Sequence, residues 1–92
     1  MYFVYVLWSF KLRKRYVGST GNVEKRLEEH NRGCNKFTKG GIPWILIYEE
    51  EYETKSESRK RESFLKSGQG RKWLDNKFPD LGKAQEWFSA RG

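Results

Sequence analysis

Two apolar segments limit this chain to a fold built on buried strands. Residues 2–8 are rich in β-branched and aromatic residues, and residues 44–48 form a second unbroken apolar run after Pro43. Such side chains favour extended backbone, and a strand that is apolar on both faces is usually covered on both sides. We therefore expect 2–8 to be a covered strand and 44–48 to be a central strand buried on both faces.

The rest of the chain predicts a hairpin followed by helices. The polar turn 9–14 leads into a short second strand at 15–19, which should return antiparallel to the first. Helical spacing and end signals predict helices at 23–32, 54–67, about 71–77 and 81–90. Gly68 and Gly70 are expected to end the second helix. The expected order is β-β-α-β-α-α-α, an α/β fold with a three-stranded, mainly antiparallel sheet flanked by helices.

Capping residues mark two of the helix starts. Asn22 is expected to be the N-cap of the first helix because its side-chain oxygen can accept a backbone N–H. Thr54 and Glu57 stand three residues apart and form a capping box for the second. These signals define where the helices begin.

Charge and cysteine content restrict the function and the compartment. The chain has 19 Lys and Arg against 12 Asp and Glu, a net charge of +7. Such a chain attracts polyanions, because Lys and Arg contacts to phosphate dominate nucleic-acid affinity. The single cysteine, Cys34, excludes an intramolecular disulfide and fits a cytoplasmic protein. We expect no membrane span and read the apolar N-terminus as a strand, not a signal peptide.

Most catalytic residue sets are absent from the sequence. One His and one Cys cannot build a Cys/His zinc site, and neither a Gly-x-Ser-x-Gly elbow nor a P-loop is present. Five residues with useful chemistry remain: Tyr5, Tyr16, Arg26, His30 and Glu62. Taken singly, each has an ordinary structural alternative, as a packed tyrosine or as a charge on a helix surface.

The two tyrosines lie in segments that resemble the motifs of a known nuclease family. Phe3-Val4-Tyr5 and Tyr16-Val17-Gly18 look like the paired GIY and YIG motifs of the GIY-YIG nucleases. The tyrosines stand eleven residues apart on one expected hairpin. Phe3 departs from the motif by replacing its first glycine.

Further positions extend the resemblance over residues 2 to about 76. Arg26 follows Tyr16 by ten residues, where the family carries its arginine, and His30 follows four residues later, as in many small members. Glu62 lies in a segment that resembles the helix holding the family's metal-binding glutamate. The resemblance implies a single nuclease-like domain at 1–92, with a core at about 2–76 and a C-terminal helical extension at 77–92. The chain looks like the small, single-domain bacterial members of the family. These members are UvrC-like, which means that they resemble the N-terminal domain of the excinuclease subunit UvrC.

The family pattern is less closely followed at two further points, the residue after Gly18 and the family's late asparagine. Ser19 stands where excinuclease-type members carry a lysine, so one phosphate contact is either lost or supplied elsewhere. Asn76 is the candidate counterpart of the family's late asparagine. These differences affect the details of catalysis more than the fold.

The resemblance implies a metal-dependent endonuclease that hydrolyses phosphodiester bonds of DNA, including structured or damaged DNA in repair or recombination. Glu62 would hold a divalent metal, Mg²⁺ or alternatively Mn²⁺, which often takes only one or two protein carboxylates. Arg26 carries a permanent charge and a fork that fits phosphate oxygens. We favour Tyr16 as general base or water-positioning group, with Tyr5 orienting the water. His30 would contact a tyrosine or the phosphate. We expect these five residues to converge on one side of the sheet.

The expected partner is DNA, with no membrane, and the protein is expected to be a monomer or weak dimer. Candidate nucleic-acid contacts are the basic residues Lys14, Arg15, Lys36, Lys39, Arg59, Lys60, Lys66, Arg71 and Lys72. One alternative is a non-catalytic nucleic-acid-binding module, against which Glu62 argues because a pure binder gains nothing from an anion beside phosphate. The other is a protein-interaction module or partner-dependent nuclease subunit, which an exposed apolar face at 81–90 would favour.

Overall fold

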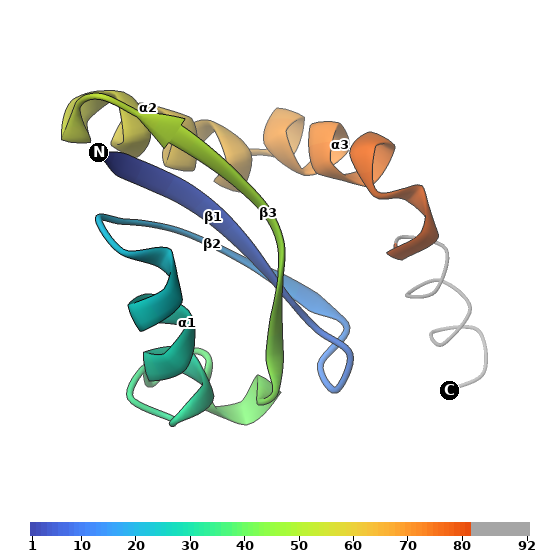
Figure 1. The fold of residues 1–92 in the computed structure, drawn as a ribbon. Coiled ribbons are helices and arrows are strands. Elements are labelled where there is room, and N and C mark those ends of the chain that lie inside the picture. Colours follow the sequence, from blue (N-terminus) through green and yellow to red (C-terminus); the bar gives the residue numbers. More distant parts are fainter. Residues whose placement is uncertain (82–92) are drawn as a thin grey trace. The chain divides into compact units, whose positions relative to one another are not determined.

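The computed structural model describes residues 1–81 (Figure 1). The chain divides into two compact units, Met1–Glu62 and a second that begins at Ser63. The helix expected at 81–90 lies outside the described residues from residue 82 onward. The domain bounds expected from the sequence stay a prediction.

The described elements follow the predicted order and confirm the fold class. The strands are β1 (Tyr2–Ser9), β2 (Lys14–Thr20) and β3 (Trp44–Tyr52). The helices are α1 (Val23–Asn31), the 3₁₀ helix η1 (Lys39–Gly41), α2 (Lys55–Lys66) and α3 (Gly68–Lys77). None of the helices within residues 1–81 has the length and apolar character that spanning a bilayer demands.

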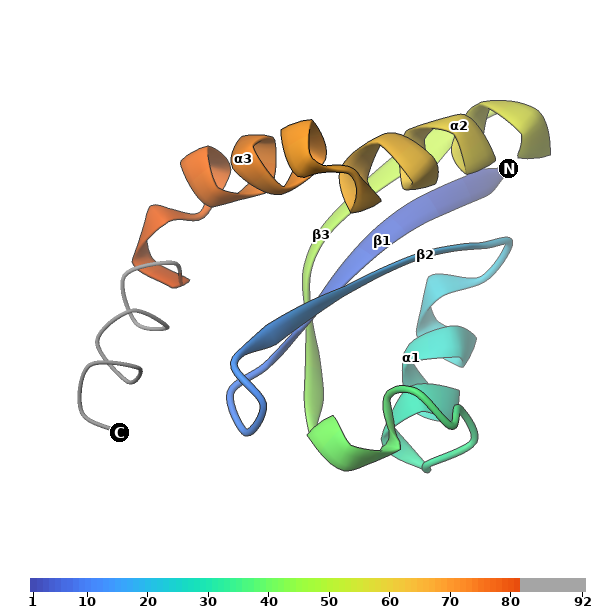
Figure 2. The ribbon, with the colours of Figure 1, turned by 180° about the vertical axis from the view of Figure 1, so that it is seen from behind.

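β1 is the central strand of the sheet. The strand order is β2-β1-β3, and β1 pairs antiparallel with both neighbours (Figures 1 and 2). Val4, Val6 and Leu7 are fully buried. The prediction that segment 2–8 is covered on both faces is therefore confirmed.

β3 is an edge strand, so the prediction for residues 44–48 is wrong. Trp44 is buried, but Ile45 and Leu46 are 42% and 38% exposed. A three-stranded sheet has one central position, and β1 occupies it. An apolar run reports the composition of a strand and does not report which position the strand takes in the sheet.

The side chains of β1 alternate between two faces of the sheet. Tyr5 and Leu7 lie on the face that α1 covers, which we call the Tyr5 face, in a core with Val23 and Trp44. Val4 lies on the opposite face, which we call the Val4 face. Since directly paired residues share a face, the partners of Val4, Ser19 of β2 and Glu50 of β3, lie there too.

Side-chain hydrogen bonds begin the helices where the sequence predicts. Asn22 caps α1 by accepting a hydrogen bond from the N–H of Lys25 at 3.1 Å. In the predicted capping box, Thr54 Oγ1 accepts from the N–H of Glu57, and Glu57 Oε1 accepts from the N–H of Thr54, both at 3.2 Å. Both predicted caps are confirmed.

The placement of Gly68 and Gly70 at the end of the second helix is wrong, because both lie in the first turn of α3. Ser67 is the N-cap of α3, and its hydroxyl accepts from the N–H of Gly70 at 3.2 Å. A Cβ on Gly70 would lie 2.0 Å from the carbonyl oxygen of Phe64. Glycine therefore permits α3 to begin directly against the last turn of α2.

Glu50 and Arg61 fasten the first part of α2 to the Val4 face. The Glu50 carboxylate accepts hydrogen bonds from Arg61 Nε at 2.8 Å and Nη2 at 3.1 Å. It also accepts from the hydroxyls of Tyr48 and Tyr52. Burial raises the pKa of Glu50, but these donors outweigh burial and leave the pKa below its usual value. The carboxylate is therefore held in its charged form.

We predict that Glu50→Gln lowers the free energy of unfolding by about 1–3 kcal/mol near neutral pH, because it removes a charged acceptor from four hydrogen bonds. Because the folded pKa lies below the ordinary value of 4.5, this contribution is present above that pH. It disappears as the pH falls through the folded value. Urea unfolding at about pH 7 and about pH 3 measures both effects. The exposed Glu53→Gln is the control, and equal losses in the two variants would contradict the assignment.

Candidate active site

Tyr5 and Tyr16 lie side by side on the Tyr5 face of the hairpin. Their ring centroids are 6.2 Å apart, and Tyr5 is 1% exposed whereas Tyr16 is half-buried. Gly18 pairs with Tyr5, and a Cβ on Gly18 would lie 2.5 Å from the Tyr5 hydroxyl oxygen and 2.7 Å from Cζ. The glycine of the Tyr16-Val17-Gly18 motif therefore provides the space in which the Tyr5 phenol lies across β2.

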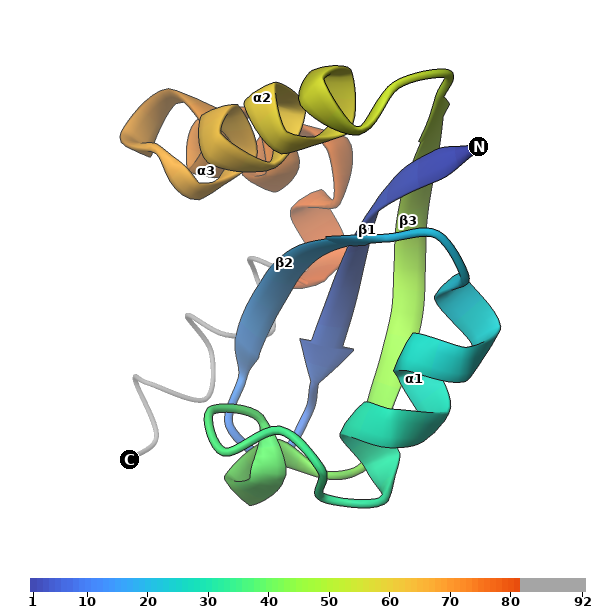
Figure 3. The same cartoon turned by 90° about the vertical axis from the view of Figure 1, so that its left-hand side faces the viewer.

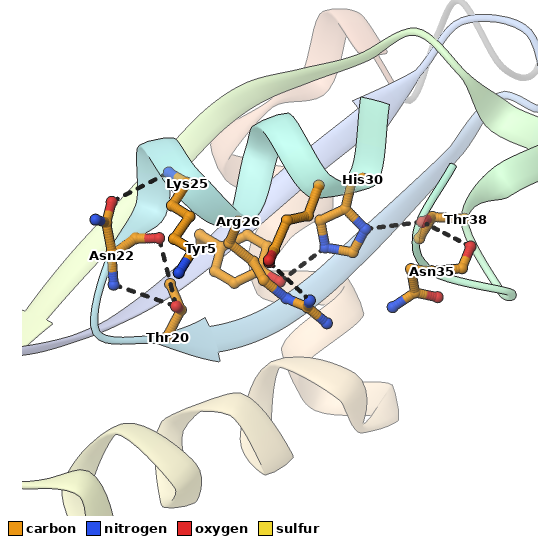
Figure 4. A network of polar contacts seen from close by, with 9 residues as sticks. Tyr5, Thr20, Asn22, Lys25, Arg26, His30, Asn35 and Thr38 are labelled. Atoms are coloured by element: carbon orange, nitrogen blue, oxygen red, sulfur yellow. Dashed lines mark hydrogen bonds and ion pairs between the residues drawn. The ribbon is translucent and has the colours of Figure 1, made fainter. Parts of the chain in front are cut away.

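His30 connects the Tyr5 phenol to the segment that follows α1 (Figure 4). Its ring is fully buried, with Nε2 2.9 Å from the Tyr5 hydroxyl and Nδ1 2.7 Å from Thr38 Oγ1. The Thr38 hydroxyl donates to the carbonyl oxygen of Asn35 at 3.5 Å. We assign the tautomer from this network. Thr38 accepts from Nδ1–H, so Nε2 accepts from the hydroxyl of Tyr5.

Burial favours the neutral form of both partners in this hydrogen bond. Burial and the positive charge of Arg26 lower the pKa of His30, against the opposing effect of Glu29. Burial, followed by Tyr16, raises the pKa of Tyr5 to about 12, with Arg26 acting in the opposite direction. Tyr5 therefore keeps its proton near neutral pH and acts as a hydrogen-bonding group.

Arg26 lies one turn before His30 on α1 and beside the Tyr5 phenol (Figure 4). Its Nη1 donates to Glu29 Oε1 at 3.1 Å, in an ion pair whose side chains are 35% and 28% exposed. α1 thus places a cation at the border between the buried phenol and solvent. A guanidinium there can approach a phosphate with little further desolvation.

Glu62 reaches the hairpin from the other face of the sheet. Ser19 Oγ donates to Glu62 Oε1 at 2.6 Å, and the Ser19 side chain lies on the Val4 face. The Glu62 charge still contributes to raising the pKa of Tyr5. Figure 3 shows β2 passing between α1 and the start of α2. The five candidate residues are therefore arranged around the edge strand β2, and not on one face as we expected.

The predicted nucleic-acid contacts are distributed over both units. Lys14 and Arg15 lie on β2, and Arg59 and Lys60 lie on α2. Lys36 lies between α1 and η1, and Lys39 is the first residue of η1. Three further residues belong to the second unit, namely Lys66, Arg71 and Lys72. All are exposed except Arg15, which is half-buried. Their role in binding stays a prediction.

Two contacts of the site were not predicted from the sequence. Ser19 was identified as a departure from a lysine, but its bond to Glu62 spans 43 residues. Thr38, which holds His30, had no distinguishing local signal.

No group of three or more His, Cys, Asp and Glu residues within residues 1–81 could hold a metal ion. A metal held here would need ligands from water or substrate.

Comparison with known proteins identifies the family of the chain. Residues 1–76 match the family described as GIY-YIG catalytic domain. A UPF0213 protein of Clostridium perfringens is 43% identical over 67 residues, which cover 72% of this chain and 71% of the relative. UPF0213 proteins of Staphylococcus aureus are 49% identical over 53 residues, 56% of this chain and 65% of theirs. No solved structure matches the chain. The names of these relatives specify no activity.

We predict that Gly18→Ala destabilises the protein by about 1–3 kcal/mol, because the buried Tyr5 ring cannot move away from the added methyl group. Gly40→Ala is the matched control, since a Cβ there meets nothing within 4 Å. It should change stability by less than about 1 kcal/mol. Chemical denaturation of both variants tests this, and equal losses would show that the close packing of Gly18 on Tyr5 is not a constraint.

We predict that the wild-type protein loses stability as the pH falls below about 6.5, while His30→Gln lacks this dependence. The folded pKa of His30 is below the ordinary value of 6.5, so the unfolded chain takes up the proton first. Stability is therefore full above that pH and falls at lower pH. Urea unfolding between about pH 8 and about pH 5.5 measures how steeply the free energy of unfolding depends on pH. This pH interval lies above the range in which Glu50 titrates. Parallel slopes in the two proteins would exclude a buried neutral His30.

Proposed function

The chain belongs to the GIY-YIG catalytic-domain family, which is a family of nucleases, and we propose that it is a metal-dependent endonuclease that hydrolyses phosphodiester bonds of DNA. The observation that carries this proposal is the arrangement around β2. Tyr5, Tyr16, Arg26 and His30 approach this edge strand from one face, and Glu62 is held at it from the other. A cation, two phenols and a carboxylate beside one strand match the needs of phosphodiester hydrolysis.

The donor chemistry at Glu62 fits Mg²⁺, with Mn²⁺ as the alternative. Mg²⁺ prefers oxygen ligands, keeps several waters and takes one or two carboxylates together with substrate phosphate. A single carboxylate oriented by Ser19 meets that requirement. When bound, the ion would supply charge neutralisation at the phosphoryl oxygens and a lower pKa for water.

The phenols and Arg26 would divide the remaining tasks. Arg26 would bind the phosphoryl oxygens through its planar fork. Tyr5 donates its proton to His30 and its oxygen interacts with the guanidinium of Arg26, so one lone pair remains with which it would orient a water molecule. The more accessible Tyr16 would receive or direct the proton of that water. His30 would act by positioning Tyr5, and contact with the substrate is not needed for this role.

The proposed substrate is DNA, including structured or damaged DNA, bound through the basic residues around the hairpin and on α2. The net charge of +7 supports a polyanionic substrate. The protein would act in the cytoplasm as a monomer or weak dimer. Glu62 is what separates this proposal from a non-catalytic binding module, since it stands beside the cations that would hold a phosphate.

We predict that Glu62→Gln lowers the cleavage rate by at least about 100-fold while the fold remains intact. Glutamine can still accept the hydrogen bond from Ser19, but it lacks the charge that a divalent metal needs. Arg26→Ala should have a comparable effect. Cleavage of labelled single-stranded, duplex and branched DNA during a titration of Mg²⁺ and Mn²⁺ measures the rates.

The exposed Glu51→Gln is the charge-matched control and should cut at the wild-type rate. Circular dichroism confirms that each variant is folded. Undiminished cutting by folded Glu62→Gln at saturating metal would remove Glu62 from the mechanism.

A further inference from the structure

A hollow of about 340 Å³ opens beside the carboxylate that we assign to metal binding. It is lined by residues of β1, α2 and the end of β2, namely Tyr2, Ser19, Thr20, Gly21, Lys55, Ser58 and Arg59. All of them belong to the first compact unit. Ser19 connects the hollow to the Glu62 carboxylate, because its side chain lines the hollow and its hydroxyl donates a hydrogen bond to Glu62.

One face of α2 connects the hollow to Glu62. Lys55, Ser58, Arg59 and Glu62 follow the i, i+3, i+4, i+7 spacing of residues that share a helix face. Given the rise per residue in an α-helix, the two cations stand roughly 5–10 Å from Glu62 along the helix axis. A nucleic-acid strand that has one phosphate at Glu62 can therefore place a nearby phosphate of the same strand in the hollow.

The serine and threonine hydroxyl groups that line the hollow are engaged within the protein. Ser58 Oγ donates to the carbonyl oxygen of Lys55 at 2.8 Å, and Thr20 Oγ1 donates to that of Asn22 at 3.4 Å. Within residues 1–81, the side-chain nitrogens of Lys55 and Arg59 form neither an ion pair nor a hydrogen bond. Both side chains are exposed. The side-chain groups that remain for a ligand are the two cations and the phenol of the exposed Tyr2, which can donate a hydrogen bond, so the hollow favours an anion.

We propose that this hollow binds a backbone phosphate of the DNA strand, one to three nucleotides from the phosphate that is cut. This inference rests on the proposed nuclease function and assigns a substrate contact to its site. Successive nucleotides of one strand rise about 3.4 Å each, so the spacing along α2 corresponds to a neighbouring phosphate. Arg59 supplies a planar fork and Lys55 a mobile point charge. Arg59 was among the nucleic-acid contacts predicted from the sequence, whereas Lys55 and Tyr2 were not.

The first experiment measures binding of a short labelled DNA oligonucleotide in EDTA, where metal-dependent cutting is absent. The variant Lys55→Gln/Arg59→Gln should bind about tenfold more weakly than wild type at low salt. Its slope of log affinity against log salt should be smaller by roughly one, as expected for the loss of one phosphate contact. Lys25→Gln/Arg32→Gln removes two exposed positive charges, one on α1 and one at its C-terminal end, and is the control for charge. A loss in Lys55→Gln/Arg59→Gln no greater than in this control would overturn the proposal.

The second experiment places a single uncharged methylphosphonate at each position of the same oligonucleotide in turn. At one position the neutral linkage should weaken binding by wild type but not by Lys55→Gln/Arg59→Gln, because the contact is already lost. If every position weakens both proteins equally, the cations do not bind one defined phosphate and the subsite is refuted.

Cleavage in Mg²⁺ or Mn²⁺ separates this inference from the function on which it rests. In the double variant, KM should rise with kcat little changed, since the cations hold the strand away from the bond that is cut. Cutting by wild type without any methylphosphonate coupling would remove the subsite alone. Coupling without cutting under any metal condition would retain a phosphate site but remove the nuclease.

Discussion

The hydrogen bond between the Tyr5 hydroxyl and His30 Nε2 is the contact on which the candidate site depends. It joins the central strand to α1 through two buried side chains, since Tyr5 is 1% exposed and His30 is fully buried. Separating the partners would leave two buried polar groups unpaired, at a cost of about 1–3 kcal/mol for each. The bond therefore determines how α1 lies against the sheet. Through α1 it also determines where Arg26 meets the phenol.

The edge strand β2 brings together groups from both faces of the sheet. Neighbouring residues of a strand point to opposite faces, so Gly18 lies against Tyr5 while Ser19 points toward α2 and holds Glu62. At a central strand, the same alternation would separate these groups by the thickness of the sheet. At an edge that no further strand of residues 1–81 covers, both sets of groups would be able to reach one substrate strand.

Charge pairing on α2 places an acidic residue within a basic surface. Arg61 is bound by Glu50 of β3, and the next residue, Glu62, is bound by Ser19 of β2. These two contacts hold the middle of α2 against both edge strands. They also keep a carboxylate next to Lys55 and Arg59, where repulsion of a phosphate by Glu62 would be reduced by a divalent cation.

The sequence by itself determined the family of the chain and where two of its helices, α1 and α2, begin. The spacing of Tyr5, Tyr16 and Arg26 identified the family, because motif residues on adjacent elements are separated by short stretches of chain. Asn22 and Thr54 marked helix starts through local hydrogen bonds. The sequence shows these features because each depends either on residues only a few positions apart or on a motif with a fixed spacing.

Only the tertiary structure decided which strand is central and which residues meet across the sheet. Both apolar runs have the composition of buried strands, but β3 lies at an edge because β1 occupies the single central position. The contacts of Ser19 with Glu62 and of Gly70 with Phe64 depend on strand register and helix packing. Local sequence does not encode such contacts, since they arise when distant segments are brought together by burial of the whole core.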